Sequence, residues 1–289
     1  PDFKVTVLEK SSKLLSKVKV SGGGRCNVTN HRSKPSELVP FYPRGNKKLH
    51  PLFKEFSSID MIQWLVKRGV ETKTEEDLRM FPITDSSQTI IDCFLQQAQK
   101  HGVDIVREVA VKTIKPEGSK WLVETNKEPY YADKVIMATG SSASAWDMLK
   151  NLGLKAAKTV PSLFTFNIQD ARLKNLQGIS FPDAQIKVAG TKLAENGPLL
   201  ITHKGLSGPA VLKLSAWGAY QLEELQYKFN IIINFTSLKP EEIRQHLLNY
   251  KQANPKRKIH NYPLFDLPKR FWEQLVTFCG IEEHTPFME

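Results

Sequence analysis

A glycine-rich loop near the start of the sequence is the first feature whose residue types could bind a ligand. Gly22, Gly23 and Gly24 stand in a row, and Arg25 and Asn27 follow closely. Glycine reaches backbone conformations that are closed to other residues, and its missing side chain lets a ligand lie close to the backbone. Successive N–H groups in such a loop bind anions, and a guanidinium fits a phosphate. The loop therefore favours a phosphate-bearing ligand, although a glycine triplet by itself is more often a flexible segment.

The segment before this loop has the pattern of a buried β-strand that ends on an acid. Residues 3–9 read FKVTVLE, and Glu9 is the last of them. In a dinucleotide-binding βαβ unit the second strand ends on a carboxylate that binds ribose hydroxyls. The first strand of such a unit, with its GxGxxG turn, lies about 20 residues upstream, which is ahead of Pro1. We therefore expect residues 1–289 alone to bind a dinucleotide cofactor weakly.

The apolar periodicity beyond the loop predicts elements that alternate between helix and strand. Helices are expected over residues 59–69 and from Asp85 or Ser86 to His101. Strands are expected over residues 103–106, 108–114, 120–125 and 131–140, the last of them buried. From about residue 158 the pattern changes to short strands at 165–168, 184–188 and 227–235, which suggest a barrel or sandwich. Helices are expected over 239–248, 264–267 and 271–278.

Four motifs occur in a fixed order along the chain. They are KLLSKVKVSGGGRCNVTN at residues 13–30, Arg79–Asp85, Ala138–Gly140 and Gly197–Pro209. In this order they resemble the signatures of BaiN/YhiN-type flavoproteins, a family that includes aminoacetone-oxidase-type FAD-binding enzymes. Two signatures of that family are not found in this sequence, namely the first glycine turn and the C-terminal segment that closes around the flavin.

The resemblance implies both a fold and an activity. The implied fold is α/β, an FAD/NAD(P)-binding Rossmann-like domain of the two-dinucleotide-binding-domain type, with an inserted β-barrel domain and a small helical module. The expected limits are residues 1–157 for the incomplete Rossmann-like domain, 158–238 for the barrel and 239–289 for the helical module. The implied activity is that of an FAD-dependent oxidoreductase transferring hydride between the flavin and a small organic substrate, with NAD(P)H as a candidate reductant. The alternative is a non-catalytic binding protein of the same fold.

The expected cofactor-binding residues come from the loop, the strand end and the resemblance. Glu9 would bind the adenosine ribose, and the loop Gly22–Asn27 would bind the phosphate and ribityl region. Val109, for the adenine, and Ala138–Gly140, for the adenosine-pyrophosphate side, rest on the resemblance alone. The full set is Glu9, Lys10, Gly22, Gly23, Gly24, Arg25, Asn27, Val109, Ala138, Thr139 and Gly140.

Three further side chains could carry chemistry. His203 stands before a glycine-rich stretch that we expect to enter a helix, and it is either a weak candidate catalytic group or a histidine that holds the loop. Ser207 is expected to cap that helix rather than act as a nucleophile, because GLSGP is not the GxSxG elbow. Cys26 is expected to be a buried packing residue, because no neighbouring cysteine could complete a redox pair. No motif predicts a metal site.

Composition restricts location and partners. The three cysteines are widely spaced, which argues against a disulfide framework and fits a reducing compartment. No apolar stretch is long enough to span a membrane, so we expect a cytoplasmic protein. The net charge of +11 admits a basic nucleic-acid-binding module, but the lysines extend along the whole chain and the one dense run is Lys256–Lys258. We therefore expect a small-molecule substrate and no nucleic-acid partner; the sequence does not define the oligomeric state.

Overall fold

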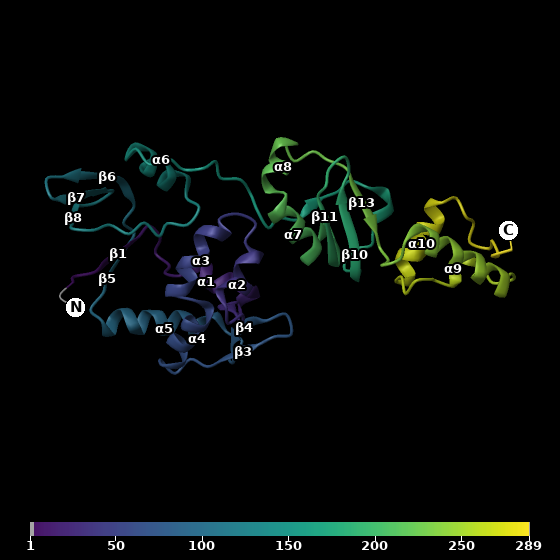
Figure 1. Cartoon of the computed structure of the whole chain (residues 1–289), viewed down its shortest axis with the longest axis horizontal. Helices are drawn as coiled ribbons and strands as arrows, with labels where there is room; N and C mark the ends of the chain where they lie inside the picture. The colour runs from purple at the N-terminus through teal and green to yellow at the C-terminus, as the bar shows by residue number, and fades with distance from the viewer. Residues whose placement is uncertain (1–2, 289) are drawn as a thin grey trace. The chain divides into compact units, whose positions relative to one another are not determined.

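The chain folds into two compact units, each with its own apolar core. The computed structural model describes residues 3–288, and the units are Pro1–Ala157 and Lys158–Glu289. Figure 1 shows the mixed helices and strands of the first unit and the sheet and helices of the second. None of the helices among residues 3–288 combines the length and apolar character that crossing a membrane requires.

A parallel pair of strands organises the first unit. β1 (Thr6–Glu9) pairs with β5 (Asp104–Arg107), and the register places Glu9 opposite Arg107. Parallel strands need a crossover connection, which here contains most of the helices of the unit. These helices are α1 (Ser16–Val20), η1 (Ser21–Gly24), α2 (Pro35–Leu38), η2 (Val39–Phe41), α3 (Asn46–Glu55), α4 (Ser58–Val66) and α5 (Ser87–Lys100).

Two small antiparallel sheets and one further helix complete this unit. The first sheet has the order β2 (Thr29–Asn30), β4 (Arg79–Pro82), β3 (Thr72–Thr74). The second is a meander of β6 (Val111–Glu117), β7 (Lys120–Thr125) and β8 (Tyr130–Ala132), followed by helix α6 (Ala143–Asn151).

Local sequence signals explain where the longer helices begin and end. Ser57 and Asp60 form a capping box at the start of α4, and Gly69 adopts a positive φ of 75° just beyond its end. Ser86 caps α5, so the cap is this serine and not Asp85. Both helices direct apolar side chains into one core, where Leu65 and Ile90 are almost completely buried.

A five-stranded antiparallel sheet forms the centre of the second unit. Its order is β13 (Ile231–Asn234), β10 (Ser180–Val188), β11 (Ala194–Thr202), β12 (Gly205–Ser207), β9 (Phe166–Asn167). Buried and exposed residues alternate along β10, as expected for a sheet with one covered face. The other elements of the unit are the helices η3 (Ala171–Leu173), α7 (Pro209–Trp217), α8 (Ala219–Glu224), α9 (Pro240–Ala253), η4 (Ile259–Asn261) and α10 (Lys269–Phe278).

The C-terminal helices share a core with this sheet. The ring of Phe271 from α10 lies 4.9 Å from that of Phe181 on β10 and 4.5 Å from that of Phe235, measured between centroids. The expected limits of the barrel and of the helical module, at residues 238 and 239, stay a prediction.

Two predicted elements are wrong. The buried strand expected over residues 131–140 is a strand only in β8, and Ile136 beyond it is 91% exposed. A buried strand needs a neighbour on its hydrogen-bonding edges, and no strand within residues 3–288 pairs with 133–140. The helix expected at residues 264–267 is a turn, because Phe265 and Asp266 both adopt a positive φ that a helix does not allow.

Candidate functional site

The glycine loop is a tight turn with an open outer face. Gly22, Gly23 and Gly24 all have positive φ, of 56°, 70° and 90°. A Cβ atom on Gly22 would lie 2.6 Å from the backbone nitrogen of Asn27, so no side chain fits there. A Cβ atom on Gly23 or Gly24 would meet no atom within 4 Å. Gly22 therefore shapes the turn, while the backbone of Gly23 and Gly24 faces open space.

Arg25 holds this loop in place through two carboxylates. Its Nη2 donates to Glu75 at 2.6 Å, its Nε donates to Asp85 at 2.8 Å, and its guanidinium lies 4.0 Å from the ring centroid of buried Phe81. The bonds to Glu75 and then Asp85 raise the pKa of Arg25. Its charge is thus compensated inside the protein. Arg25 acts as a clamp between the loop and the Arg79–Asp85 motif, and its expected contact to a phosphate stays a prediction.

Asp85 gives this clamp a pH dependence. Hydrogen bonds from Lys73 and then Arg25 lower the pKa of the Asp85 carboxyl. A lowered folded-state pKa contributes stability above the unfolded-state pKa, and this stability is lost as the pH falls through the folded-state pKa. We predict that the difference in unfolding free energy between wild type and Asp85→Asn, measured by urea denaturation, shrinks as the pH is lowered from the unfolded-state pKa of the carboxyl through its folded-state pKa. Asp133→Asn, at a side chain that is 85% exposed, is the control and should show no such trend.

Glu9 and Val109 lie side by side at the end of the parallel strands. The backbone N–H of Val109 donates to the carbonyl of Glu9 at 3.0 Å, and Val109 is 1% exposed. The carboxylate of Glu9 accepts two bonds at Oε1, from the backbone N and from Oγ of Ser11, at 2.7 and 2.9 Å. These bonds orient the carboxylate, a role for Ser11 that sequence reasoning missed. The N–H of Val109 is already used, so a contact to adenine would need its carbonyl.

The Ala138–Gly140 segment lies against the helix that leads into the glycine loop. Gly140 has a φ of 63°, and a Cβ atom built on it would lie 2.7 Å from Nζ of Lys17 in α1. Ala138, Thr139 and Lys10 are exposed. The structure thus brings the Ala138–Gly140 segment next to Lys17, a cation that the sequence did not single out and whose charge would suit a pyrophosphate.

His203 belongs to the second unit, and the stretch that follows it is the strand β12, not the start of a helix. It lies in the hairpin turn between β11 and β12, where Oγ1 of Thr202 donates to the carbonyl of Gly205 at 3.2 Å. The helix α7 begins only at Pro209 and is capped by Gly208, so the prediction of Ser207 as its cap is wrong. Polar side chains surround the same hollow as His203, namely Gln169, Asp170, Lys174, Asn175 and Gln177.

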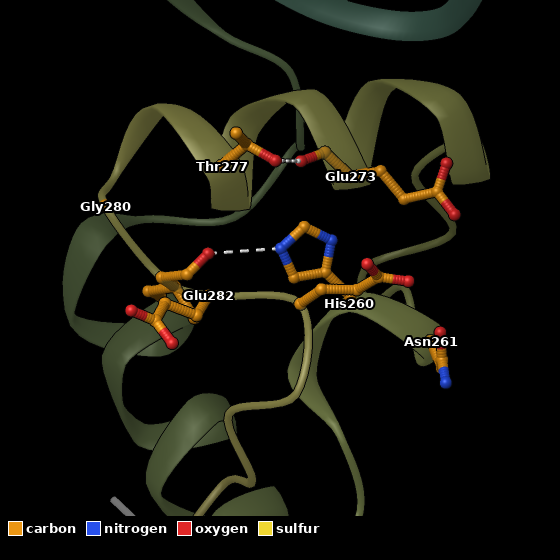
Figure 2. Close-up of a pocket in the computed structure, with 8 residues that line it drawn as sticks. His260, Asn261, Glu273, Thr277, Gly280 and Glu282 are labelled. Atoms are coloured by element: carbon orange, nitrogen blue, oxygen red, sulfur yellow. Dashed lines mark hydrogen bonds between the residues drawn. The ribbon is translucent and has the colours of Figure 1, made fainter.

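A second hollow in this unit surrounds His260, as Figure 2 shows. His260 is 9% exposed, and its Nε2 lies 3.2 Å from the carbonyl oxygen of Ile281. Oγ1 of Thr277 donates to the backbone carbonyl of Glu273 at 2.8 Å. These hydrogen bonds join residues of the same C-terminal segment, so the polar groups beside this hollow hold the segment together.

Cys26 is 6% exposed and packs in the core of the first unit, as predicted. No cluster of metal-binding side chains occurs within residues 3–288.

The comparison with protein families decides the identity of the fold. The model of the HI0933-like protein Rossmann domain matches residues 1–281. The chain belongs to this family. Membership in the HI0933-like family confirms the resemblance to BaiN/YhiN-type flavoproteins and the α/β fold class with its Rossmann-like domain. Where a β-barrel is expected from the sequence, the second unit contains an open five-stranded sheet.

Curated relatives cover nearly the whole chain. It is 27% identical over 283 residues to the ribosomal RNA dihydrouridine synthase of Escherichia coli (strain K12), an alignment that covers 94% of this chain and 67% of that protein. The corresponding enzyme of Haemophilus influenzae is 26% identical over 284 residues, covering 93% and 67%. The 3-dehydro-bile acid delta(4,6)-reductase of Clostridium scindens is 21% identical over 301 residues, covering 100% and 72%.

Similar solved structures are more distant. BexE is 12% identical with a TM-score of 0.34, covering 72% of this chain and 40% of its own. Halogenase PltM in complex with phloroglucinol and FAD is 15% identical with a TM-score of 0.29, covering 80% and 53%. The chain therefore spans about half the length of these structures or less.

Proposed function

We propose that this chain carries the FAD-binding site of a flavin-dependent oxidoreductase. The observation that supports this most is the clamped glycine loop, whose Gly23 and Gly24 leave open space over bare backbone. In the proposed site the carboxylate of Glu9 accepts hydrogen bonds from the ribose hydroxyls. The Gly22–Asn27 loop binds the phosphate and ribityl region of FAD. The carbonyl of Val109 faces the adenine, and Lys17 with Ala138–Gly140 neutralises the pyrophosphate.

The bound flavin supplies the hydride chemistry, and the protein supplies binding, orientation and electrostatics. The names of the curated relatives describe one type of reaction, because dihydrouridine synthesis and a delta(4,6) reduction both add hydrogen to a carbon–carbon double bond. We propose that this protein also reduces a carbon–carbon double bond of its substrate. NAD(P)H is the reductant that returns the oxidised flavin to its reduced form. A small organic molecule is one candidate acceptor.

A uracil base in RNA is the second candidate acceptor. The observation that favours it is the activity for which two relatives are named, together with the excess of cations, +11 in this chain. Polyanions bind basic proteins through the release of counterions, and this contribution to binding requires no base-specific contact.

A reoxidation experiment tests this proposal. The protein that carries these 289 residues is purified, reduced anaerobically with NADPH or NADH, and mixed with uridine-containing RNA or with a small conjugated enone. We expect the flavin absorbance to return with one of the two acceptors, and the product to be heavier by two hydrogens in a mass spectrum. Flavin that accepts no electrons from either nucleotide, and returns none to either acceptor, would contradict the proposal and favour a non-catalytic binding protein.

A further inference from the structure

The positive charge of this protein is concentrated in one segment of the first unit. Residues 10–54 contain eleven Lys and Arg but one acidic residue, Glu37, so they hold nearly the whole excess of +11. The cations themselves extend along the whole chain, as expected from the sequence, but the net excess lies mainly in this segment because it contains a single acidic residue. Lys256–Lys258 is the densest run, but the broader segment carries the larger charge.

The second half of this segment and the two residues after it, residues 35–56, expose aromatic rings. The helices α2, η2 and α3 contribute no buried residue to any core. α2 and α3 contact one another and η2, and Figure 1 shows them close together. Phe41 is 58% exposed, Tyr42 is 37% exposed and Phe56 is 51% exposed. Large apolar side chains on a monomer surface are ordinary when scattered, but several rings in one short segment indicate an interaction surface.

Contacts with neighbouring side chains orient two of these rings, Phe41 and Tyr42. The guanidinium of Arg32 lies 4.0 Å from the ring centroid of Phe41, and the ring of Tyr42 lies 5.5 Å from that of Phe53. Arg32 is itself fixed, because its Nη1 donates to Asn30 at 2.7 Å and its carbonyl accepts from Ser58 at 2.6 Å. The ring of Phe41 thus has one face on a cation and remains more than half exposed, an arrangement on which a flat group can stack.

Exposed lysines accompany the rings. Lys47 and Lys54 are seven residues apart in α3, so they lie on the same side of the helix two turns apart. Neither they nor Lys48 form an ion pair with any residue in 3–288, in contrast to Arg25 with its two carboxylates. Their charge is therefore available to an external anion.

We propose that this basic–aromatic surface, made of Arg32, Phe41, Tyr42, Lys47, Lys54 and Phe56, binds single-stranded RNA. Single strands are bound by a combination of cations that follow the phosphates and rings on which the bases stack. The exposed rings supply the stacking platforms, and the unpaired lysines supply the phosphate contacts. The biological role of this contact rests on the proposed function with an RNA acceptor, but the binding itself requires no flavin. An anionic membrane is the other partner that such a surface could meet, and the experiment separates the two.

The test measures the anisotropy of a fluorescein-labelled uridine-rich RNA against protein concentration at several salt concentrations. Lys47→Gln/Lys54→Gln should weaken binding at least tenfold at low salt and lower the slope of log K against log salt by about 0.7 for each phosphate that is no longer neutralised. Phe41→Leu should weaken binding about tenfold because a stacking platform is removed, with little change in the salt slope. Lys127→Gln/Lys192→Gln removes the same charge from exposed positions elsewhere and should leave the affinity unchanged.

Flavin content distinguishes this proposal from the preceding one. The Lys47→Gln/Lys54→Gln protein should keep its flavin and its circular dichroism spectrum, whereas a loop variant such as Gly23→Ala should lose flavin but keep RNA binding. The proposal is overturned if the wild-type protein binds no RNA, if the two lysine double variants bind it equally well, or if vesicles containing phosphatidylserine compete RNA away at stoichiometric concentrations through the same residues.

Discussion

Gly205→Ala is expected to unfold the sheet of the second unit, while Gly190→Ala in the same unit is expected to be nearly harmless. A Cβ atom on Gly205 would lie 2.2 Å from the carbonyl oxygen of Phe166 and 2.5 Å from the nitrogen of Ile168, both backbone atoms of the edge next to it. No flexible side chain can move away, so β9 must leave the sheet. Forced overpacking and a disfavoured φ of 143° together cost about 3 to 5 kcal/mol.

Gly190 provides the matched control. Its φ of 73° is also positive, but a Cβ atom there would meet nothing within 4 Å. Alanine should then cost about 1 kcal/mol, which is the backbone contribution alone. The measurement is urea denaturation combined with hydrogen exchange of peptides from residues 158–289. Equal destabilisation by both changes would show that the close approach of Gly205 to the backbone of Phe166 and Ile168 does not require a glycine.

Gly23→Ala is expected to remove the flavin without unfolding the protein. Gly23 has a φ of 70° and open space around it, so alanine should cost about 1 to 2 kcal/mol of stability through its backbone conformation. Its methyl group would occupy the space that a phosphate needs above the loop. Loss of two charged hydrogen bonds, each worth about 1.5–3 kcal/mol, would weaken FAD binding by about two to four decades.

Gly69→Ala separates this effect from strain. Gly69 has a φ of 75° with no atom within 4 Å of its Cβ position, but it lies at the end of α4 and outside the loop. Both variants should lose similar stability, and Gly23→Ala alone should lose FAD, measured as the ratio of cofactor to protein and by titration calorimetry. If the two variants retain FAD equally, the loop is not the cofactor contact.

Local patterns predicted the elements that carry strong periodicity. The helices around Leu65 and Ile90 and the meander strands β6 and β7 follow from the spacing of their apolar residues, with Ser86 as the cap of the second helix. The strand end at Glu9 is also where the pattern placed it. These features are determined by neighbours within a few residues, which is the range that periodicity and capping signals cover.

The errors arise where distant residues decide the structure. The ion pairs of Arg25 are also invisible to local patterns, because its partners, Glu75 and Asp85, lie 50 and 60 residues away in the sequence. Residues 133–140 have the composition of a buried strand, but a strand also requires a hydrogen-bonding neighbour, which no local pattern supplies. Only a count by segment, and not the net charge of the chain, indicates that the excess of cations over acids lies in residues 10–54.

The cofactor content of the purified protein tests the central claim most directly. The protein that carries these 289 residues is isolated from its own host, its visible absorption spectrum is recorded, and the released small molecules are identified by mass spectrometry. We predict a flavin spectrum and close to one FAD for each chain, with the FAD lost in Gly23→Ala and kept in Gly69→Ala. A colourless protein that also fails to bind added FAD would contradict this prediction.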